Sequence, residues 1–476
     1  MAEQIQITHL DDDGFGRGTV LRQDGQKRAV AVPYSLPGEV VEVMLRKWKK
    51  RGVSLGVIEK VVKPSDERVT PFCSHFTKCG GCTFQHMPQE AQLAMKEEKV
   101  RKLFPLESFS KAHFFPIIAS PQSVAYRNKM EYSFSQTATG EKYLGLILGQ
   151  TRGWVFNLEE CHLVEPWFAD TCKEVRLWWH ESGLDAYFHG GDRGALRTLT
   201  LRQGMTSNDR MVMLTVSGNP DYALKKQQLE AFVSAVERSA LPEKEGHLSI
   251  VLRVQQIAKG SPTQFYEMIL KGPDYIREYI TLQDRSGAEK TCEFQISPQA
   301  FFQPNTRTAN ILYKRALELA EVHAESVVYD LYCGIGVFGM CASLLAKKVI
   351  GIELSPESSY DAKTNSARLG LENFTIYKGD VGKVLEEKKQ ELLPPDIVIL
   401  DPPRVGLDMR AIQEVSRLAP KTIVYVSCNP VTQSANVLSF VENGYELCVI
   451  QPVDQFPHTP HVENIAILKK RVDISE

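Results

Sequence analysis

A lone cysteine, Cys428, follows an apolar run and precedes a proline turn, in the order Ser427-Cys-Asn-Pro430. A thiolate is a strong nucleophile, and a covalent intermediate can divide one difficult reaction into two easier ones. At the end of a strand the sulfur can be exposed, and nearby hydrogen-bond donors can lower the pKa of its thiol. A buried cysteine that acts as a small hydrophobic residue is the alternative. We favour the nucleophile, because two ligand-binding signals are predicted at the same edge of the sheet.

Glycines lie between an apolar run and a helical segment, in Asp330-Leu-Tyr-Cys-Gly-Ile-Gly-Val-Phe-Gly339. Glycine lets the backbone turn tightly against a ligand, and Glu353, at the end of the next apolar run, can accept hydrogen bonds from two ribose hydroxyls. The spacing obeys the pattern of dinucleotide sites, so an NAD-dependent dehydrogenase fits this feature alone. A glycine turn that serves packing only is the other alternative.

The sequence Asp401-Pro-Pro-Arg404 ends another apolar run. Paired prolines cannot continue a sheet, so they hold a rigid and open backbone at the end of the strand. This turn presents Asp401 to the site, where its carboxylate can hold an amino group or a uracil N–H. The motif is common in RNA and DNA methyltransferases and is not expected in dinucleotide enzymes. It therefore favours a methyl donor over NAD.

Three further cysteines, Cys73, Cys79 and Cys82, share one glycine-bent loop, and Cys161 in Glu-Glu-Cys-His is the predicted fourth member of the set. Because we expect a cytoplasmic protein, its ten cysteines are not expected to form disulfides. Four thiolates suit either zinc or a 4Fe–4S cluster, and the spacing does not choose between the two.

Several domains must position these candidates, because 476 residues exceed one compact core. Residues 1–65 alternate β-type runs, including 39–45 and 54–62, with turn signals, which predicts a small antiparallel β-barrel. Residues 66–290 are predicted as a central mixed α+β domain that contains the cysteine loop. From 291 to 476 apolar strands and helices alternate, which implies an α/β domain with a parallel sheet covered on both faces. Any ligand should bind at the carboxyl ends of its strands.

The composition is that of a globular protein, 43% apolar and 24% charged, with no apolar run long enough to cross a membrane and no signal peptide. We expect a cytoplasmic protein without membrane contact, and no protein partner is evident. The formal net charge of −2 argues mildly against a nucleic acid partner, but residues 46–51 read Arg-Lys-Trp-Lys-Lys-Arg. Such a run can follow a phosphate backbone and stack a base, or can be a solvated strand or loop.

Several motifs together resemble one family, the RNA uracil-C5 methyltransferases with an N-terminal TRAM barrel and an iron–sulfur cluster. They are Gly14-Phe-Gly16 with Leu36-Pro-Gly-Glu39, Cys73 through Cys82, Phe301-Phe-Gln-Pro-Asn305, Asp330 through Gly336, Asp401 through Leu407, Ser427 through Thr432, and Pro457-His-Thr-Pro-His-Val-Glu463. The likeness covers nearly the whole chain, although the middle third matches loosely. It implies a TRAM/OB-like barrel, a central domain with a metal cluster, and a Rossmann-like S-adenosylmethionine methyltransferase domain. It also implies RNA as partner, 23S rRNA first and tRNA as the alternative.

The resemblance further implies a covalent route. C5 of uracil is a poor nucleophile, and addition of the Cys428 thiolate at C6 turns the ring into an enolate whose C5 can attack the sulfonium methyl. A base must then remove the proton from C5, and a carboxylate within hydrogen-bond reach is adequate. The likeness gives this role to Glu463.

The remaining site residues are also implied by the resemblance. Those for the methyl donor are Gln303, Tyr332, Gly334, Gly336, Glu353, Asp380 and Asp401, with a helix N-cap as the alternative for Asp380; those for RNA are Phe301 and Arg404; those for the 4Fe–4S cluster are Cys73, Cys79, Cys82 and Cys161. Two other functions stay open: an RNA-binding protein without catalysis, and an iron–sulfur oxidoreductase that binds NAD.

Overall fold

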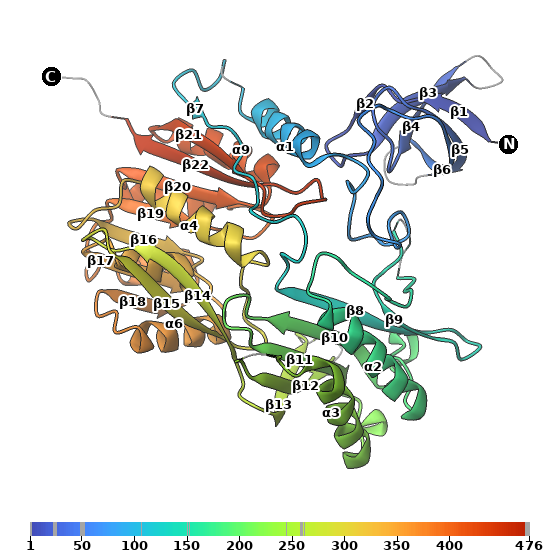
Figure 1. Ribbon diagram of the computed structural model, residues 1–476. Coiled ribbons are helices and arrows are strands. Elements are labelled where there is room, and N and C mark those ends of the chain that lie inside the picture. The colour runs from blue at the N-terminus through green and yellow to red at the C-terminus, as the bar shows by residue number, and fades with distance from the viewer. Residues whose placement is uncertain are drawn as a thin grey trace.

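The computed structural model describes residues 2–21, 26–47, 53–105, 107–149, 151, 153–243, 245–257, 260 and 262–471. These residues form three large sheets in separate parts of the molecule and a two-stranded hairpin (Figure 1). Within the described ranges, no helix is long and apolar enough to cross a membrane.

The first sheet is barrel-like. It contains β1 (Glu3–Gln6), β2 (His9–Leu10), β3 (Gly16–Leu21), β4 (Lys27–Val32), β5 (Val40–Lys47) and β6 (Ser54–Lys63), in the order β1-β5-β6-β4-β3-β2. Strands β1 and β3 lie so close that a Cβ at Gly18 would come within 2.3 Å of Ile5, so the sheet curls on itself. The strands predicted at 39–45 and 54–62 are confirmed.

A buried carboxylate explains the turn Leu36-Pro-Gly-Glu39. The Glu39 carboxylate accepts hydrogen bonds from the backbone N–H groups of Leu36 at 2.8 Å and Ser65 at 3.2 Å, and from the Arg68 guanidinium at 2.6 Å. Burial alone would raise the pKa of Glu39, but these bonds outweigh burial and lower it. The carboxylate thus ties the start of β5 to the segment that leaves the barrel.

The second sheet forms the central part of the chain. It contains β8 (Lys129–Gln136), β9 (Lys142–Gly145), β10 (Leu196–Gln203), β11 (Arg210–Ser217), β12 (Leu248–Gln256) and β13 (Gln264–Lys271), in the order β13-β12-β11-β10-β8-β9, together with the short helices η1 (His189–Gly191) and η2 (Pro220–Tyr222). Helices α2 (Trp167–Glu181) and α3 (Lys226–Ala240) pack on one face, where the rings of Trp178 and Phe232 meet edge to face at 5.1 Å. The other face contributes charged side chains to the site described below.

The third part carries the strand and helix alternation. Its strands are β16 (Val327–Leu331), β17 (Lys348–Glu353), β18 (Phe374–Lys378), β19 (Ile397–Leu400), β20 (Thr422–Ser427), β21 (Tyr445–Val453) and β22 (Glu463–Lys470), and its helices are α4 (Thr306–Leu319), α5 (Val337–Ser343), α6 (Pro356–Arg368), α7 (Val381–Glu387), α8 (Met409–Leu418) and α9 (Pro430–Glu442). Apolar clusters cover both faces of this sheet, as the alternation predicts. The hairpin β14 (Ile276–Gln283) and β15 (Glu289–Ile296) packs into the same core, so the predicted boundary at 290/291 falls inside β15.

Two segments from earlier in the chain join this third part. Strand β7 (His113–Phe114) extends the edge of its sheet by pairing with β21, and helix α1 (Gln89–Leu103) lies against α9 and β21, between the barrel and the sheet (Figure 1). The full strand order is therefore β18-β17-β16-β19-β20-β22-β21-β7.

One feature of this sheet differs from the prediction. Strands β16 to β20 are parallel, but β22 runs antiparallel to both of its neighbours, so the sheet is not purely parallel. The reason is that β21 and β22 are joined by a nine-residue connection without a crossover helix, which suits antiparallel neighbours. As a consequence, the first residues of β22 pair with the last residue of β20, in the register Ser427 to Asn464.

Candidate active site

The carboxyl ends of the parallel strands open into a cavity of about 900 Å³. Most of the residues predicted for the donor, the RNA and the chemistry line it: Phe301, Gln303, Tyr332, Gly334, Glu353, Asp380, Asp401, Arg404, Cys428 and Glu463. Gly336 is not among the lining residues. It is the N-cap of α5 with a φ of 82°, and a Cβ there would meet Met340 and Phe374 at 3.0 and 3.1 Å. Glycine is required at this position because the turn needs a positive φ and because a Cβ would lie too close to its neighbours.

The glycine turn and Glu353 form one hydrogen-bonded unit. Glu353 accepts hydrogen bonds from the backbone N–H groups of Gly334 at 2.9 Å and Ser355 at 2.7 Å. Asp330 is buried below the turn, where its carboxylate accepts from Gly339 N–H at 2.7 Å and burial raises its pKa to about 8. Because each carboxylate oxygen has two lone pairs, Glu353 can still accept hydrogen bonds from a ligand in the cavity.

Asp380 and Gln303 lie at two further edges of the same cavity. Asp380 is the N-cap of α7 and accepts from Lys383 N–H at 3.1 Å, so the N-cap alternative is correct and the side chain also lines the cavity. Gln303 is buried, and its amide oxygen lies 3.4 Å from the amide nitrogen of Gln455. Phe301, by contrast, is 66% exposed at the cavity wall, where a base can reach its ring.

Two carboxylates, the half-buried Asp401 and the buried Glu463, line the same cavity. Glu463 is 1% exposed, and one of its oxygens has no hydrogen-bond partner among the described residues. Burial and the neighbouring Asp401 raise the pKa of Glu463 well above its ordinary value, with Arg404 opposing the shift. Burial raises the pKa of Asp401 to about 7. Two like charges in a buried site disfavour each other, so this pair retains a proton more readily than exposed carboxylates.

Cys428 lies directly after β20 and is half-buried in the same cavity. The expected lowering of its pKa is wrong for the protein alone: burial raises the pKa of the thiol, and the charge of Glu463 raises it further. Arg404 opposes this shift through its charge and a hydrogen bond. The loop itself holds Arg404 in place, because its carbonyl accepts from the Asn429 amide at 2.9 Å and from the Thr432 hydroxyl at 3.3 Å.

The cavity also has a wall that the sequence did not predict. Arg127, Lys129 and Arg202, from the segment before β8, from β8 and from β10, line the same cavity. Arg202 is engaged by the Ser297 and Ala300 carbonyls, at 3.0 and 2.6 Å. Arg127 has a buried Nε without a hydrogen-bond partner in the described part of the chain. Burial and the nearby Arg202 lower the pKa of Lys129 to about 8. The sequence predicts only a mixed α+β domain in this region, and these cations belong to none of the motifs.

Comparison with known proteins identifies the family. The model of the family described as tRNA (Uracil-5-)-methyltransferase matches residues 237–471. An uncharacterized RNA methyltransferase of Protochlamydia amoebophila (strain UWE25) is 50% identical over 439 residues, which cover 92% of this chain and 99% of that protein. Another, from Caldanaerobacter subterraneus subsp. tengcongensis, is 32% identical over 467 residues and covers 98% of each chain. The chain belongs to the RNA (uracil-5-)methyltransferase family.

A solved structure shares the fold. The crystal structure of Pyrococcus abyssi tRNA (uracil-54, C5)-methyltransferase, in complex with S-adenosyl-L-homocysteine, matches with a TM-score of 0.67 and 24% identity, over 98% of this chain and 100% of that one. The predicted enzyme class, an RNA (uracil-C5)-methyltransferase, is confirmed.

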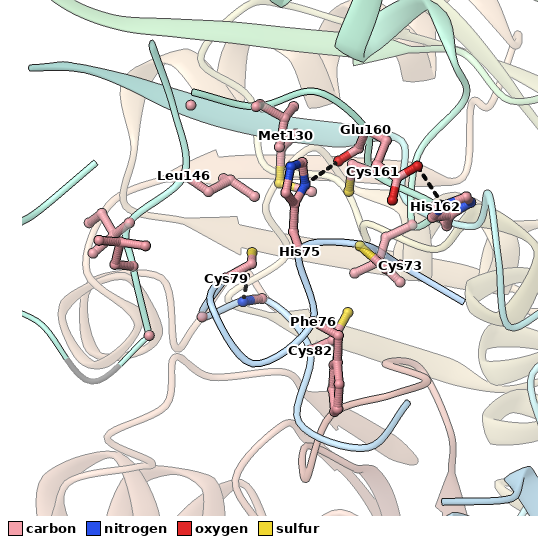
Figure 2. A pocket seen from close by; sticks show the side chains of 18 of the residues that line it. Cys73, His75, Phe76, Cys79, Cys82, Met130, Leu146, Glu160, Cys161 and His162 are labelled. Carbon is pink, nitrogen blue, oxygen red and sulfur yellow. Dashed lines mark hydrogen bonds and ion pairs between the residues drawn. The ribbon is translucent and has the colours of Figure 1, made fainter. Parts of the chain in front are cut away.

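The four predicted cysteines of this methyltransferase line a second cavity, of about 530 Å³. Figure 2 shows the sulfur atoms of Cys73, Cys79, Cys82 and Cys161 around a common space, and the Cys79 sulfur accepts from Gly81 N–H at 3.3 Å. The fold therefore brings Cys161 to the loop, as predicted. However, no group of three His, Cys, Asp or Glu side chains in the described ranges is arranged to hold a single metal ion.

The basic run at 46–51 falls largely outside the described residues, which omit 48–52. Arg46 is exposed near the end of β5. The predicted role of this run in RNA binding remains a prediction.

Proposed function

We propose that this methyltransferase transfers the methyl group of S-adenosylmethionine to C5 of a uridine in RNA, with Cys428 as nucleophile and Glu463 as base. One observation supports this function above all. A half-buried thiol and a buried carboxylate with a free oxygen, 35 residues apart in the chain, line one cavity together with the glycine turn and Glu353. The cavity volume of about 900 Å³ lies within the usual size range of ligand sites. A nucleoside donor and a uracil ring would together fill it.

The chemistry balances over three steps. The Cys428 sulfur bonds to C6 of uracil, and the electron pair of the C5–C6 double bond moves toward the C4 oxygen as an enolate. C5 of the enolate then attacks the sulfonium methyl, and the bond from sulfur to that methyl breaks to leave S-adenosylhomocysteine. Finally Glu463 takes the proton from C5, the double bond re-forms and the C6–S bond breaks, which returns the Cys428 thiolate.

Two neighbouring side chains assist in this scheme, one at the nucleophile and one at the ligands. Arg404 opposes the raised pKa of Cys428 and so stabilises the thiolate. Asp401, whose pKa is raised to about 7, can hold an amino group of the donor or the N–H of uracil when it is ionised. At the donor end, Gln303, Tyr332, Gly334, Glu353 and Asp380 are the proposed contacts of S-adenosylmethionine, since all of them line the cavity.

In this proposal, RNA enters the cavity against the wall that carries Arg127, Lys129 and Arg202. Arg127 and Lys129 line the cavity and form no side-chain hydrogen bond or ion pair that would neutralise them within the described residues. Backbone phosphates seek such cations, and phosphate contacts position a nucleic acid without reading its sequence. Phe301, exposed at the same cavity, is the proposed stacking partner of a base.

The cysteine cavity is proposed to hold a 4Fe–4S cluster on Cys73, Cys79, Cys82 and Cys161. Four thiols around one cavity suit a 4Fe–4S cluster or zinc, and the family resemblance favours the cluster. When bound, the cluster would cross-link the loop to residue 161; the residues of the methyl-transfer site need no electron from it.

The proposed substrate is 23S rRNA, on the resemblance carried by the barrel and the cysteine set. The matched family model and the Pyrococcus structure are both named for tRNA, so tRNA is the competing substrate. Purified enzyme with tritiated donor should methylate 23S rRNA transcripts and leave tRNA unmodified. Methylation of tRNA alone would replace the rRNA assignment, and mapping of 5-methyluridine in a deletion strain would identify the target uridine.

The catalytic roles are tested by variants that fail at different steps. Cys428→Ala should bind RNA and donor without reacting, because C5 stays unreactive. Glu463→Gln should complete methyl transfer and then stall, so a methylated RNA–enzyme adduct should survive denaturing electrophoresis. The double variant should form no adduct, because removal of the nucleophile abolishes what the missing base would trap. Normal turnover by Glu463→Gln would remove Glu463 from the role of base, and no methylation by the wild type on any RNA would favour a binding-only protein.

A further inference from the structure

The segment that carries the proposed base has no regular structure of its own. Residues 454–462, which we call the connector, join β21 to β22, and Glu463 follows immediately as the first residue of β22. Most of the connector is buried, including Asp454, Gln455 and His458. A buried irregular segment must find partners for its backbone groups outside itself. The position of Glu463 therefore depends on its pairing with Val453 in the β21–β22 ladder and on the elements that hold the connector before it.

The main partner is helix α1, which lies far away in the sequence. Lys96 of α1 is 0% exposed, and its ammonium lies 2.5 Å from the carboxylate of Asp454, which is 1% exposed. The same ammonium donates a hydrogen bond at 2.9 Å to the carbonyl of Phe456, a residue that lines the methyl-transfer cavity. A single lysine thus holds the connector at two points, by an ion pair with Asp454 and by a hydrogen bond to the Phe456 carbonyl.

Neighbouring contacts complete the attachment. Gln92, one turn before Lys96 on α1, accepts from His458 N–H at 3.0 Å and donates to the Met87 carbonyl at 2.9 Å. The His458 carbonyl accepts from Thr83 N–H at 2.7 Å and from Phe84 N–H at 3.1 Å, and these residues directly follow the last cysteine of the loop. At its other end the connector reaches the donor side, where the Gln455 amide donates to the Asn305 carbonyl at 3.2 Å.

A buried ion pair is a weak source of net stability, because desolvation of both charges offsets most of their attraction. A fully buried Lys96–Asp454 pair therefore calls for a role beyond stability. No step of the proposed chemistry uses either charge, and neither residue lines the cavity. What the pair does hold is the backbone between β21 and Glu463.

We propose that Lys96 is a positioning residue for methyl transfer, which acts through Asp454 and the Phe456 carbonyl to hold the connector and so aim the Glu463 carboxylate at C5. This inference rests on the proposed function. Its distinctive consequence concerns the last step: without Lys96, addition and methyl transfer continue, but proton removal slows. The covalent RNA–enzyme adduct should then accumulate during turnover, as in Glu463→Gln but to a smaller degree.

The experiment compares Lys96→Met with Lys102→Met, a control on the same helix whose side chain is 69% exposed. Turnover and the fraction of enzyme trapped on RNA are measured together, with wild type, Glu463→Gln and Cys428→Ala as references. We expect Lys96→Met to lose on the order of tenfold to a hundredfold in kcat, as for a misplaced catalytic group. The KM for S-adenosylmethionine should stay within about twofold, and the trapped fraction should rise above that of the wild type. Lys102→Met should match the wild type.

Folding is controlled by a second variant. Lys96→Met leaves the Asp454 charge buried without a partner and can destabilise the protein, whereas Lys96→Met/Asp454→Asn leaves no uncompensated charge. The folded double variant should also trap more adduct, since it lacks the hydrogen bond to Phe456. A folded double variant with the wild-type trapped fraction would overturn the positioning role while the proposed function stands. If Glu463→Gln itself traps nothing, the assignment of the base fails first and this inference fails with it.

Discussion

Replacement of Lys129 by methionine should weaken RNA binding in a way that depends on salt. Methionine keeps an apolar stem of similar length and removes only the charge. Lys129 lines the methyl-transfer cavity from β8, on the face opposite α2 and α3. If it contacts one phosphate, it adds about 0.7 to the slope of log affinity against log salt for a single strand. The variant should lose about that much slope.

The expected magnitude follows from this slope. Between about 50 and 200 mM salt, a fourfold change, one phosphate contact accounts for a factor of about 2.6 in affinity, so the gap between wild type and variant should narrow by this factor. Loss of Arg127 as well should bring the combined factor to about 7, because the two contacts multiply. Burial lowers the pKa of Lys129 to about 8, so a rise in pH through 8 deprotonates it and should weaken RNA binding by the wild type but not by the variant.

Fluorescence anisotropy with a labelled RNA over a series of salt concentrations measures this slope directly. Calorimetry with S-adenosylmethionine checks that the donor end is intact. Lys173→Met on α2 is the matched control, since it lies in the same part of the chain and, among the described residues, forms an ion pair only with Asp170, at 3.9 Å. An unchanged slope for Lys129→Met, or an equal change in the Lys173 control, would refute the phosphate assignment.

Three further predictions concern the base, the cysteines and the barrel. Burial raises the pKa of Glu463 well above its ordinary value, and a base acts only when deprotonated, so turnover should rise with pH at values above the usual range of a carboxylate, while Glu463→Gln should lack this limb; a flat wild-type profile would argue against a buried carboxylate as base. Protein purified without oxygen should be brown with about four irons, and Cys161→Ala should lose the colour but still bind S-adenosylmethionine; colourless protein with zinc would contradict the cluster. Glu39→Gln should lower the free energy of unfolding by roughly 2–4 kcal/mol, because it removes the ion pair of a buried carboxylate with Arg68, and a thermal melt unchanged by the substitution would contradict this.

Much of the donor end could be predicted from the sequence, because its residues follow strands in short motifs. The glycine turn after β16, Glu353 at the end of β17 and Asp401 after β19 are each fixed by local pattern, and parallel strands bring their carboxyl ends to one edge. Gly336 shows the limit of this reasoning. Its motif position is correct, but its side of the turn faces Met340 and Phe374 rather than the cavity.

The features that the sequence did not predict depend on contacts between distant segments. Lys129 and Arg127 belong to a part of the chain without motifs, and contacts with distant segments place them at the cavity, such as the hydrogen bond that Asn128 N–H donates to the Pro304 carbonyl. The pKa of the Cys428 thiol was expected to fall, because hydrogen-bond donors at the end of a strand can stabilise a thiolate. In the folded protein the burial of the sulfur and the charge of Glu463 raise this pKa more than Arg404 lowers it. The local sequence does not specify where these groups lie relative to one another.

The reversed direction of β22 explains why the proposed base and the proposed nucleophile lie at the same end of the sheet. If β22 ran parallel to β20, its first residue would lie at the opposite end of the sheet from Cys428. Because it runs antiparallel, Asn464 pairs with Ser427, and Glu463 arrives beside the residue that follows β20. The same reversal replaces a crossover helix with the irregular connector, whose backbone must be held by α1 and the cysteine loop. The geometry that assembles the site is thus also the reason that we expect its proposed base to depend on Lys96, outside the sheet.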